Sequence, residues 1–175
     1  MFKSDKGGSS VDYTVKDIKK GYIVEYDLVS WEAIEEYEYD WGGNYKGKEW
    51  TLYDGKNEIY LYYGSFPSEE ISVSKRINMM TELPDLREDV FHKDEPRTSF
   101  AYDGKTWNIV DESPGLMINS DTKEEVEIVS WTFNDPNESE FITVVRNGEK
   151  SVDAYKGKYI ENYEVSNILP RTLED

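Results

Sequence analysis

The sequence predicts an all-β protein in which two diverged copies of one antiparallel β unit, each small-barrel- or sandwich-like, pack together. Three observations carry this prediction: period-two alternation along the chain, Asp-Gly and Asn-Gly dipeptides between the alternating runs, and an internal repeat. The 175-residue chain is 37% hydrophobic and 14% aromatic. That composition is enough to build a folded core.

The internal repeat consists of two motifs that recur in the same order. Residues 26–31 and 102–107 share the pattern Tyr-Asp-x-x-x-Trp, and residues 50–54 and 131–135 share Trp-Thr-apolar-x-Asp. A run rich in β-forming residues and ending in glycine follows each copy of the second motif. The repetition predicts two copies of one supersecondary unit, neither of which buries much surface alone.

The segment from Trp31 to Trp41 has the clearest strand pattern. Aromatic residues occupy most of the odd positions, and carboxylates occupy most of the even ones. Side chains on a strand alternate between two faces, so this pattern predicts a strand with aromatic groups on one face and acidic groups on the other.

Turn residues separate the expected strands. Asp54-Gly55, Asp103-Gly104 and Asn147-Gly148 each lie between two β-rich runs, and their glycines tolerate the positive φ of tight hairpin turns. We expect a further turn at residues 156–158, which read Lys-Gly-Lys.

The middle of the chain has weaker β character and contains Pro84 and Pro96. We interpret it as a linker with a short helical turn before Pro84. The expected organisation is a flexible tail at 1–13, a first β unit at 14–77, the linker at 78–98, a second β unit at 99–170 and a C-terminal tail at 171–175.

Acidic residues dominate the charge of the protein. Asp and Glu number 37 against 20 Lys and Arg, which gives a formal net charge of −17. Such a charge disfavours direct binding to nucleic acid and to anionic lipid, and it favours a protein partner with a basic patch. The chain has no cysteine, no apolar run long enough to span a membrane and no signal segment. We therefore expect a cytoplasmic protein without membrane insertion, and the sequence leaves its oligomeric state open.

The sequence contains no catalytic motif. His92 is the single histidine, and no nucleophile elbow accompanies it. Asp135, Asn137 and Ser139 alternate like calcium ligands, but Glu140 stands where a calcium loop needs glycine. We predict a non-catalytic protein with no metal site and no cofactor.

Adjacent carboxylate pairs are another candidate for acid–base chemistry. Glu35-Glu36 and Glu69-Glu70 are examples. Neighbouring residues on a strand point to opposite faces, so such pairs do not converge on one substrate. We interpret them as solvated surface.

The aromatic residues of the first unit are the best candidates for binding. Tyr and Trp combine a large apolar ring with a polar group, as interface anchors do. The loop at residues 42–44 has no counterpart that aligns in the second unit. The predicted binding residues are Tyr37, Tyr39, Trp41, Asn44 and Tyr45.

Taken together, these features predict an acidic binding or accessory module that docks a partner protein through an aromatic- and carboxylate-rich surface. Two alternatives stay open. One is a small-ligand binder or cryptic hydrolase with its site in a cleft between the two units. The other is a phage-encoded mimic of nucleic acid.

Several segments of the chain resemble one family. They are residues 15–27, Trp31, 49–52, 100–107 and 163–170. Over roughly residues 14–170 the chain is similar to the domain-of-unknown-function family numbered 4178, although Tyr22 stands where the family usually has Asp. The resemblance implies a bacterial, archaeal or viral origin and an accessory role, and it brings no assigned catalytic residue.

Overall fold

The computed structural model describes residues 12–171, so most of the two expected tails lies outside the described residues. Strands account for most of that range, and the predicted all-β class is confirmed. The elements in chain order are η2 (Val15–Asp17), β2 (Ile23–Tyr26), β3 (Val29–Asp40), β4 (Lys46–Tyr53), β5 (Glu58–Gly64), β6 (Glu70–Ile77), α1 (Met79–Glu82), α2 (Pro84–Lys93), β7 (Ser99–Tyr102), β8 (Lys105–Asn119), β9 (Glu125–Asn134), β10 (Phe141–Asn147), β11 (Ser151–Tyr159), η3 (Asn162–Glu164) and β12 (Val165–Leu169).

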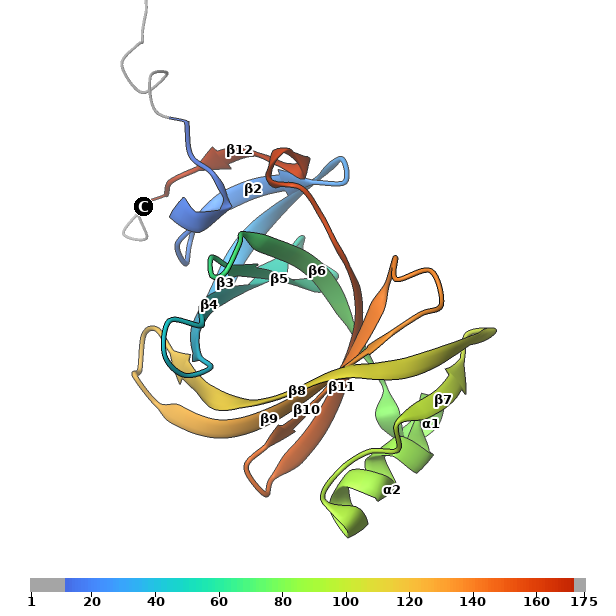
Figure 1. Cartoon of the computed structure of the whole chain (residues 1–175). Helices are drawn as coiled ribbons and strands as arrows, with labels where there is room; N and C mark the ends of the chain where they lie inside the picture. Colours follow the sequence, from blue (N-terminus) through green and yellow to red (C-terminus); the bar gives the residue numbers. More distant parts are fainter. Residues whose placement is uncertain (1–11, 172–175) are drawn as a thin grey trace, which may run out of the picture.

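The strands between residues 12 and 171 form one antiparallel sheet of 11 strands, in the order β12-β2-β3-β4-β5-β6-β11-β10-β9-β8-β7. The second half of β3 also pairs with the second half of β8, from Tyr37 opposite Asn119 to Asp40 opposite Leu116. This pairing closes eight strands into a ring, in the order β3-β4-β5-β6-β11-β10-β9-β8. Figure 1 shows the ring in end view. The first halves of β3 and β8 leave the ring, and there they pair with β2 and β7 respectively.

The two predicted units correspond to β2–β6 and β7–β11. However, β12, which we expected in the second unit at 99–170, pairs with β2, and Val165 and Ile168 pack in the first core. The units join through equivalent strands, because the last strands β6 and β11 pair with each other and so do the second strands β3 and β8. Such like-with-like antiparallel contacts are what a two-fold arrangement produces. The units are therefore connected by strand pairing at two seams, rather than by stacking one aromatic face on the other.

The first repeated motif has the same geometry in both units. The indole Nε1 of Trp31 donates a hydrogen bond to the carbonyl oxygen of Tyr26 at 3.1 Å, and that of Trp107 donates to Tyr102 at 2.9 Å. Each bond crosses a tight turn that joins two strands. The Tyr-Asp-x-x-x-Trp pattern thus records a hairpin whose tryptophan is tied to the strand before the turn.

Each unit has its own hydrophobic core among the described residues. The first core lies around Trp31 and Trp50, and the second lies around Trp107 and Trp131. All four tryptophans are less than 9% exposed. The repeated tryptophans are therefore core residues, because the face of the sheet that carries them is covered in both units.

A β-bulge divides each of the two long strands. The register shifts between Ala33 and Glu35 in β3, and at the equivalent place between Ile109 and Asp111 in β8. The extra residue at a bulge turns the following side chains to the other face. Trp31 therefore faces the first core, whereas the aromatic residues that follow it face the inside of the ring, so the expectation of one aromatic face along this strand is wrong.

Two further expectations need correction. The expected short helical turn before Pro84 is present as α1, but the segment also holds a second helix, α2, which begins at Pro84 and was not expected. Leu86 of α2 is 1% exposed and packs in the second core, so this segment covers that core (Figure 1). The expected turn at 156–158 is also absent, because β11 continues through it. A Cβ on Gly157 would lie 2.4 Å from the carbonyl oxygen of Val73, so glycine serves close strand packing there.

None of the helices between residues 12 and 171 has the length and apolar character needed to cross a membrane.

The tight turns Asp27–Leu28 and Asp103–Gly104 are equivalent in the two units but differ at their second residue. Substitutions at this residue should therefore change the stability of the protein in opposite directions. Leu28 is fully exposed at φ 65°, whereas the matching residue of the second unit is Gly104 at φ 74°. A left-handed conformation costs a residue with a side chain about 1–2 kcal/mol. We expect Leu28→Gly to raise the free energy of unfolding in urea by about 1 kcal/mol, and Gly104→Leu to lower it by about the same amount. The same direction of change in both variants would contradict this account of the turns.

Candidate functional site

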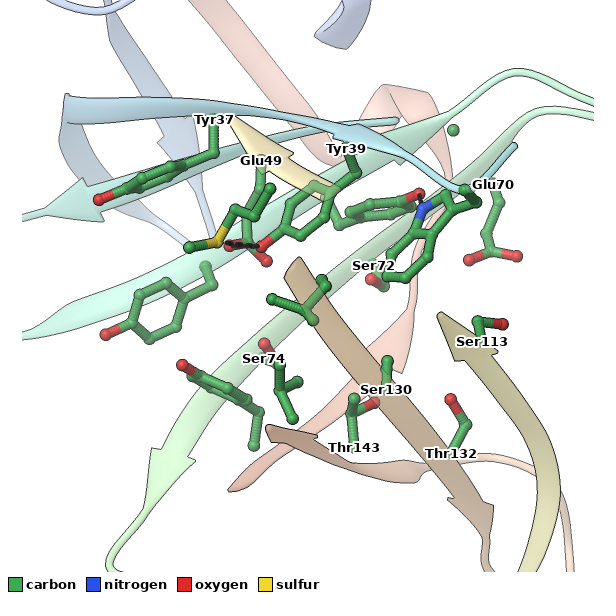
Figure 2. A pocket seen from close by; sticks show the side chains of 18 of the residues that line it. Tyr37, Tyr39, Glu49, Glu70, Ser72, Ser74, Ser113, Ser130, Thr132 and Thr143 are labelled. Carbon is green, nitrogen blue, oxygen red and sulfur yellow. Dashed lines mark hydrogen bonds between the residues drawn. The ribbon is translucent and has the colours of Figure 1, made fainter. Parts of the chain in front are cut away.

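A cavity of about 890 Å³ lies inside the ring. Its walls are the inward faces of β3–β6 and β8–β11, so both units contribute to it. Figure 2 shows tyrosine and carboxylate side chains of β3 and β4 on one side of this space, facing serine and threonine side chains on the other. The inner face of the ring is therefore polar and aromatic, whereas Trp50 and Trp131, on the opposite faces of β4 and β9, lie in the two hydrophobic cores.

Three aromatic rings of the first unit pack together in the wall. Tyr39 and Trp41 stack with their ring centres 5.4 Å apart, and Trp41 Nε1 donates a hydrogen bond to Tyr62 Oη at 3.0 Å. Glycines make room for them. A Cβ on Gly47 would lie 2.1 Å from Tyr62 Oη, and one on Gly115 would lie 2.6 Å from the Trp41 ring. Close approach to these two glycines fixes the rings in place.

Glu49 is the carboxylate most enclosed by this wall. Tyr39 Oη donates a hydrogen bond to it at 2.9 Å and also lies 3.4 Å from Met117 Sδ. Burial raises the pKa of Glu49 to about 7, against the opposing effects of the Tyr39 hydrogen bond and the positive charge of Arg76. Burial likewise raises the pKa of Tyr39 well above its ordinary value. At neutral pH the inner wall therefore holds a carboxyl group close to its titration midpoint.

Arg76 on β6 is held by aromatic rings and one carboxylate. Its guanidinium carbon lies 5.9 Å from the ring centre of Tyr60 and 5.3 Å from that of Tyr155. Its Nη1 lies 2.8 Å from Oδ1 of Asp153. The arginine is thus occupied by groups of the protein itself, in a cation–π and ion-pair arrangement.

Hydroxyl groups cover much of the remaining wall. They come from β6 of the first unit and from β8, β9 and β10 of the second, and Figure 2 labels them. Two are nearly inaccessible to solvent, with Ser72 at 7% and Ser130 at 8% exposure. The residues are Ser72, Ser74, Ser113, Ser130, Thr132 and Thr143.

Four of the five predicted binding residues line the cavity: Tyr37, Tyr39, Trp41 and Tyr45. Tyr45 lies at an exposed position, where its ring meets that of Phe66 edge-on with centres 5.0 Å apart. Asn44 belongs to the exposed turn between β3 and β4 and is not part of the cavity wall.

The cavity wall contains carboxylates that we interpreted as solvated surface, Glu35 and Glu70, and others that the sequence did not single out. Glu35, Glu49, Glu70, Asp111 and Asp153 all line the cavity. Neighbouring carboxylates diverge on one strand, but carboxylates from different strands of a closed ring converge. A carboxylate next to a core residue, such as Glu49 before Trp50, is a weak signal, because a solvent-facing strand has the same alternation.

The other candidates lie outside the cavity. His92 is exposed on α2 and contacts Glu88 of the same helix at 2.9 Å. Asp135 accepts hydrogen bonds from the backbone of Ser139 and of Glu140, which is the geometry of a hairpin turn. Within residues 12–171, no group of three His, Asp or Glu side chains has the spacing of metal ligands.

The fold and cavity define a class of all-β protein in which two fused β units enclose a polar, aromatic space. The chain belongs to the family described as Domain of unknown function (DUF4178), whose model matches residues 19–162. It is also 27% identical over 154 residues to an uncharacterized protein of Aquifex aeolicus (strain VF5). The aligned region covers 88% of this chain and 84% of the relative. No solved structure matches the chain significantly.

Because the pKa of Glu49 is raised, replacing its carboxyl group by an uncharged amide should stabilise the protein, by an amount that depends on pH. Between its ordinary value of 4.5 and about 7, the folded protein retains a proton that the unfolded chain has lost. Stability from this group is therefore present at acidic pH and is lost as the pH rises through that window. We expect Glu49→Gln to raise the Tm at pH 8 and to leave it nearly unchanged at pH 4.5, as measured by thermal denaturation.

The matched control is Glu38→Gln, because Glu38 is an exposed residue of the same strand pair. Its effect on the Tm should be small at both pH values. Equal stabilisation by Glu49→Gln at pH 4.5 and pH 8 would contradict the role of burial in this titration.

Proposed function

We propose that this protein binds a small organic molecule inside the ring cavity and releases it chemically unchanged. The observation that carries the proposal is the cavity itself, with its volume of about 890 Å³ and its polar and aromatic wall. Small-molecule sites generally occupy about 300–1,000 Å³ and combine aromatic surface with a few convergent polar groups. A closed ring of eight strands is also about wide enough to hold one small ligand.

The choice of residues on the two faces of each strand supports a binding role for the cavity. Along β9 the side chains alternate. Trp131 and Phe133 point into the second core, whereas Ser130 and Thr132 point into the ring. In β4, Trp50 lies in the first core and Thr51 in the cavity wall. A ring filled by its own side chains would carry large apolar residues inside as well, since interiors are close-packed. Hydroxyl groups at these positions leave space and offer hydrogen bonds to a ligand.

Docking of a basic protein partner is the second candidate. It is favoured by the net charge of −17 and by the exposed ring pair of Tyr45 and Phe66 at the edge of the cavity. The other aromatic residues expected at a docking surface face inward, so the surface offered to a large partner is smaller than expected. If docking occurs, its affinity should fall steeply between low and physiological salt, as measured by calorimetry with the purified partner. Salt-independent binding would remove the electrostatic basis of this candidate.

The test of the binding function compares the protein with a variant whose cavity is filled. Thr143 points into the cavity from β10, so Thr143→Trp places a large ring there. Thr106→Trp is the matched control, since Thr106 is an exposed residue of β8 outside the cavity. Each protein is incubated with a metabolite extract of the source organism and washed, and retained compounds are released by denaturation and identified by mass spectrometry.

We expect at least one compound to be retained by the natural protein and by Thr106→Trp, and to be lost from Thr143→Trp. Its mass should equal that of the compound in the extract, because the proposed role is binding without turnover. Equal retention by both tryptophan variants would place the site elsewhere, and recovery of an altered mass would indicate an enzyme.

A further inference from the structure

The charge of the cavity wall is unbalanced, which bears on the ligand class if the proposed binding function is correct. Among the described residues, the wall carries six carboxylates and two basic side chains. The basic residues are already paired, Arg76 with Asp153 at 2.8 Å and Lys46 with Asp40 at 2.9 Å. The remaining five carboxylates of the wall are Glu35, Glu49, Glu58, Glu70 and Asp111.

Three of these five carboxylates accept a hydrogen bond from a tyrosine instead of pairing with a cation. Tyr39 donates to Glu49 at 2.9 Å, as described above. The other two bonds, each 3.3 Å long, run from Tyr37 to Glu35 and from Tyr60 to Glu58. A tyrosine hydroxyl orients a carboxylate but leaves its negative charge uncompensated, and it holds the aromatic ring beside that charge.

The other two carboxylates, Glu70 on β6 and Asp111 on β8, are exposed side chains of the wall. Asp111 lies close enough to Glu70 to raise the pKa of Glu70, in addition to the larger effect of burial. Within residues 12–171, no lysine or arginine nitrogen lies within 4.0 Å of either carboxylate. Asp111 accepts a hydrogen bond from the hydroxyl of Ser113 at 2.5 Å. Like charges at such a site repel each other in the absence of a counter-charge.

Arg76 shows how this wall accommodates a positive charge. Its guanidinium group lies beside the rings of Tyr60 and Tyr155 while it pairs with Asp153. The negative face of an aromatic ring attracts a cation, and the attraction grows when water is excluded. The stacked rings of Tyr39 and Trp41 and the neighbouring Glu49 offer a similar combination. Among the described residues, no lysine or arginine nitrogen lies within 4.0 Å of Glu49, although the charge of Arg76 lowers its pKa.

We infer that the ligand of the ring cavity is a small organic cation, whose ammonium group lies against the unpaired carboxylates and whose hydrocarbon part lies against the tyrosine and tryptophan rings. An anionic ligand is disfavoured, because it would add charge of the same sign to the wall. A neutral sugar would hydrogen-bond to the hydroxyl groups and stack on the rings, but it would leave the carboxylates uncompensated. The cation relieves their repulsion, and the overall charge of −17 raises its local concentration.

The inference is tested with two probes that share a shape and differ in charge, benzylammonium and benzyl alcohol. Their affinities are measured by isothermal titration calorimetry at low ionic strength and neutral pH, and their contact with the protein by saturation-transfer NMR. We expect the Kd of benzylammonium to be at least about tenfold lower than that of benzyl alcohol. The difference should shrink as salt is added, because the attraction is electrostatic.

Charge-removing variants locate the effect. The double variant Glu49→Gln and Glu70→Gln should weaken benzylammonium binding about tenfold and leave benzyl alcohol binding unchanged. Glu38→Gln, an exposed position on the outer face of β3, should change neither affinity. Thr143→Trp should abolish the binding of both probes, since it fills the cavity.

The outcomes separate the ligand class from the binding function. If benzyl alcohol or a sugar binds as tightly as benzylammonium and Thr143→Trp blocks it, the cavity is a binding site but the cation inference is wrong. If benzylammonium fails to bind at millimolar concentration, the inference is overturned. If peptides rich in lysine bind while the small probe does not, it is overturned in favour of protein docking.

Discussion

The two β-bulges, one in β3 and one in β8, are the constraint on which the rest of the structure depends. Before each bulge the strand places a tryptophan in a hydrophobic core, and after it the strand lines the cavity. The second halves of the two strands pair with each other and close the ring. Without the change of face, Glu35, Tyr37, Tyr39 and Trp41 would not point into the space that this pairing encloses.

The duplicated unit diverged differently on its two faces. Trp50 and Trp131 occupy matching places in the two cores, where close packing restricts the choice of residue. The residues that precede them are Glu49 and Ser130, and both face the cavity. Tyr37, Tyr39 and Glu49 of the first unit therefore face Ser130, Thr132 and Thr143 of the second (Figure 2), although the second unit also contributes acidic and aromatic residues such as Asp111 and Tyr155. This asymmetry gives a ligand two chemically distinct surfaces, which a symmetric ring could not offer.

Electrostatics and enclosure reinforce each other at the inner wall. Glu49 is surrounded by aromatic rings, and burial raises its pKa to about 7 although a tyrosine hydroxyl and Arg76 oppose the shift. A charge in such a place is destabilising for the empty protein, and a bound cation would favour its ionised form. The titration of Glu49 comes from its burial. The proposed ligand class rests on the wider set of carboxylates without a paired cation, of which Glu35, Glu58, Glu70 and Asp111 are exposed.

The sequence by itself determined the all-β class, the two-unit repeat, the family and the main hairpins, because these depend on local alternation and on Asp-Gly and Asn-Gly turns. It also singled out Tyr37, Tyr39 and Trp41 as exceptional, although it placed them on an outer surface. Only the tertiary structure decided that β3 and β8 pair and that carboxylates from several strands converge. These features join residues far apart in the chain, such as Tyr37 and Asn119, and the bulge that turns Glu35 inward leaves no mark in a period-two pattern. A strand facing a polar cavity alternates in the same way as one facing water, so the closure of the ring alone distinguishes them.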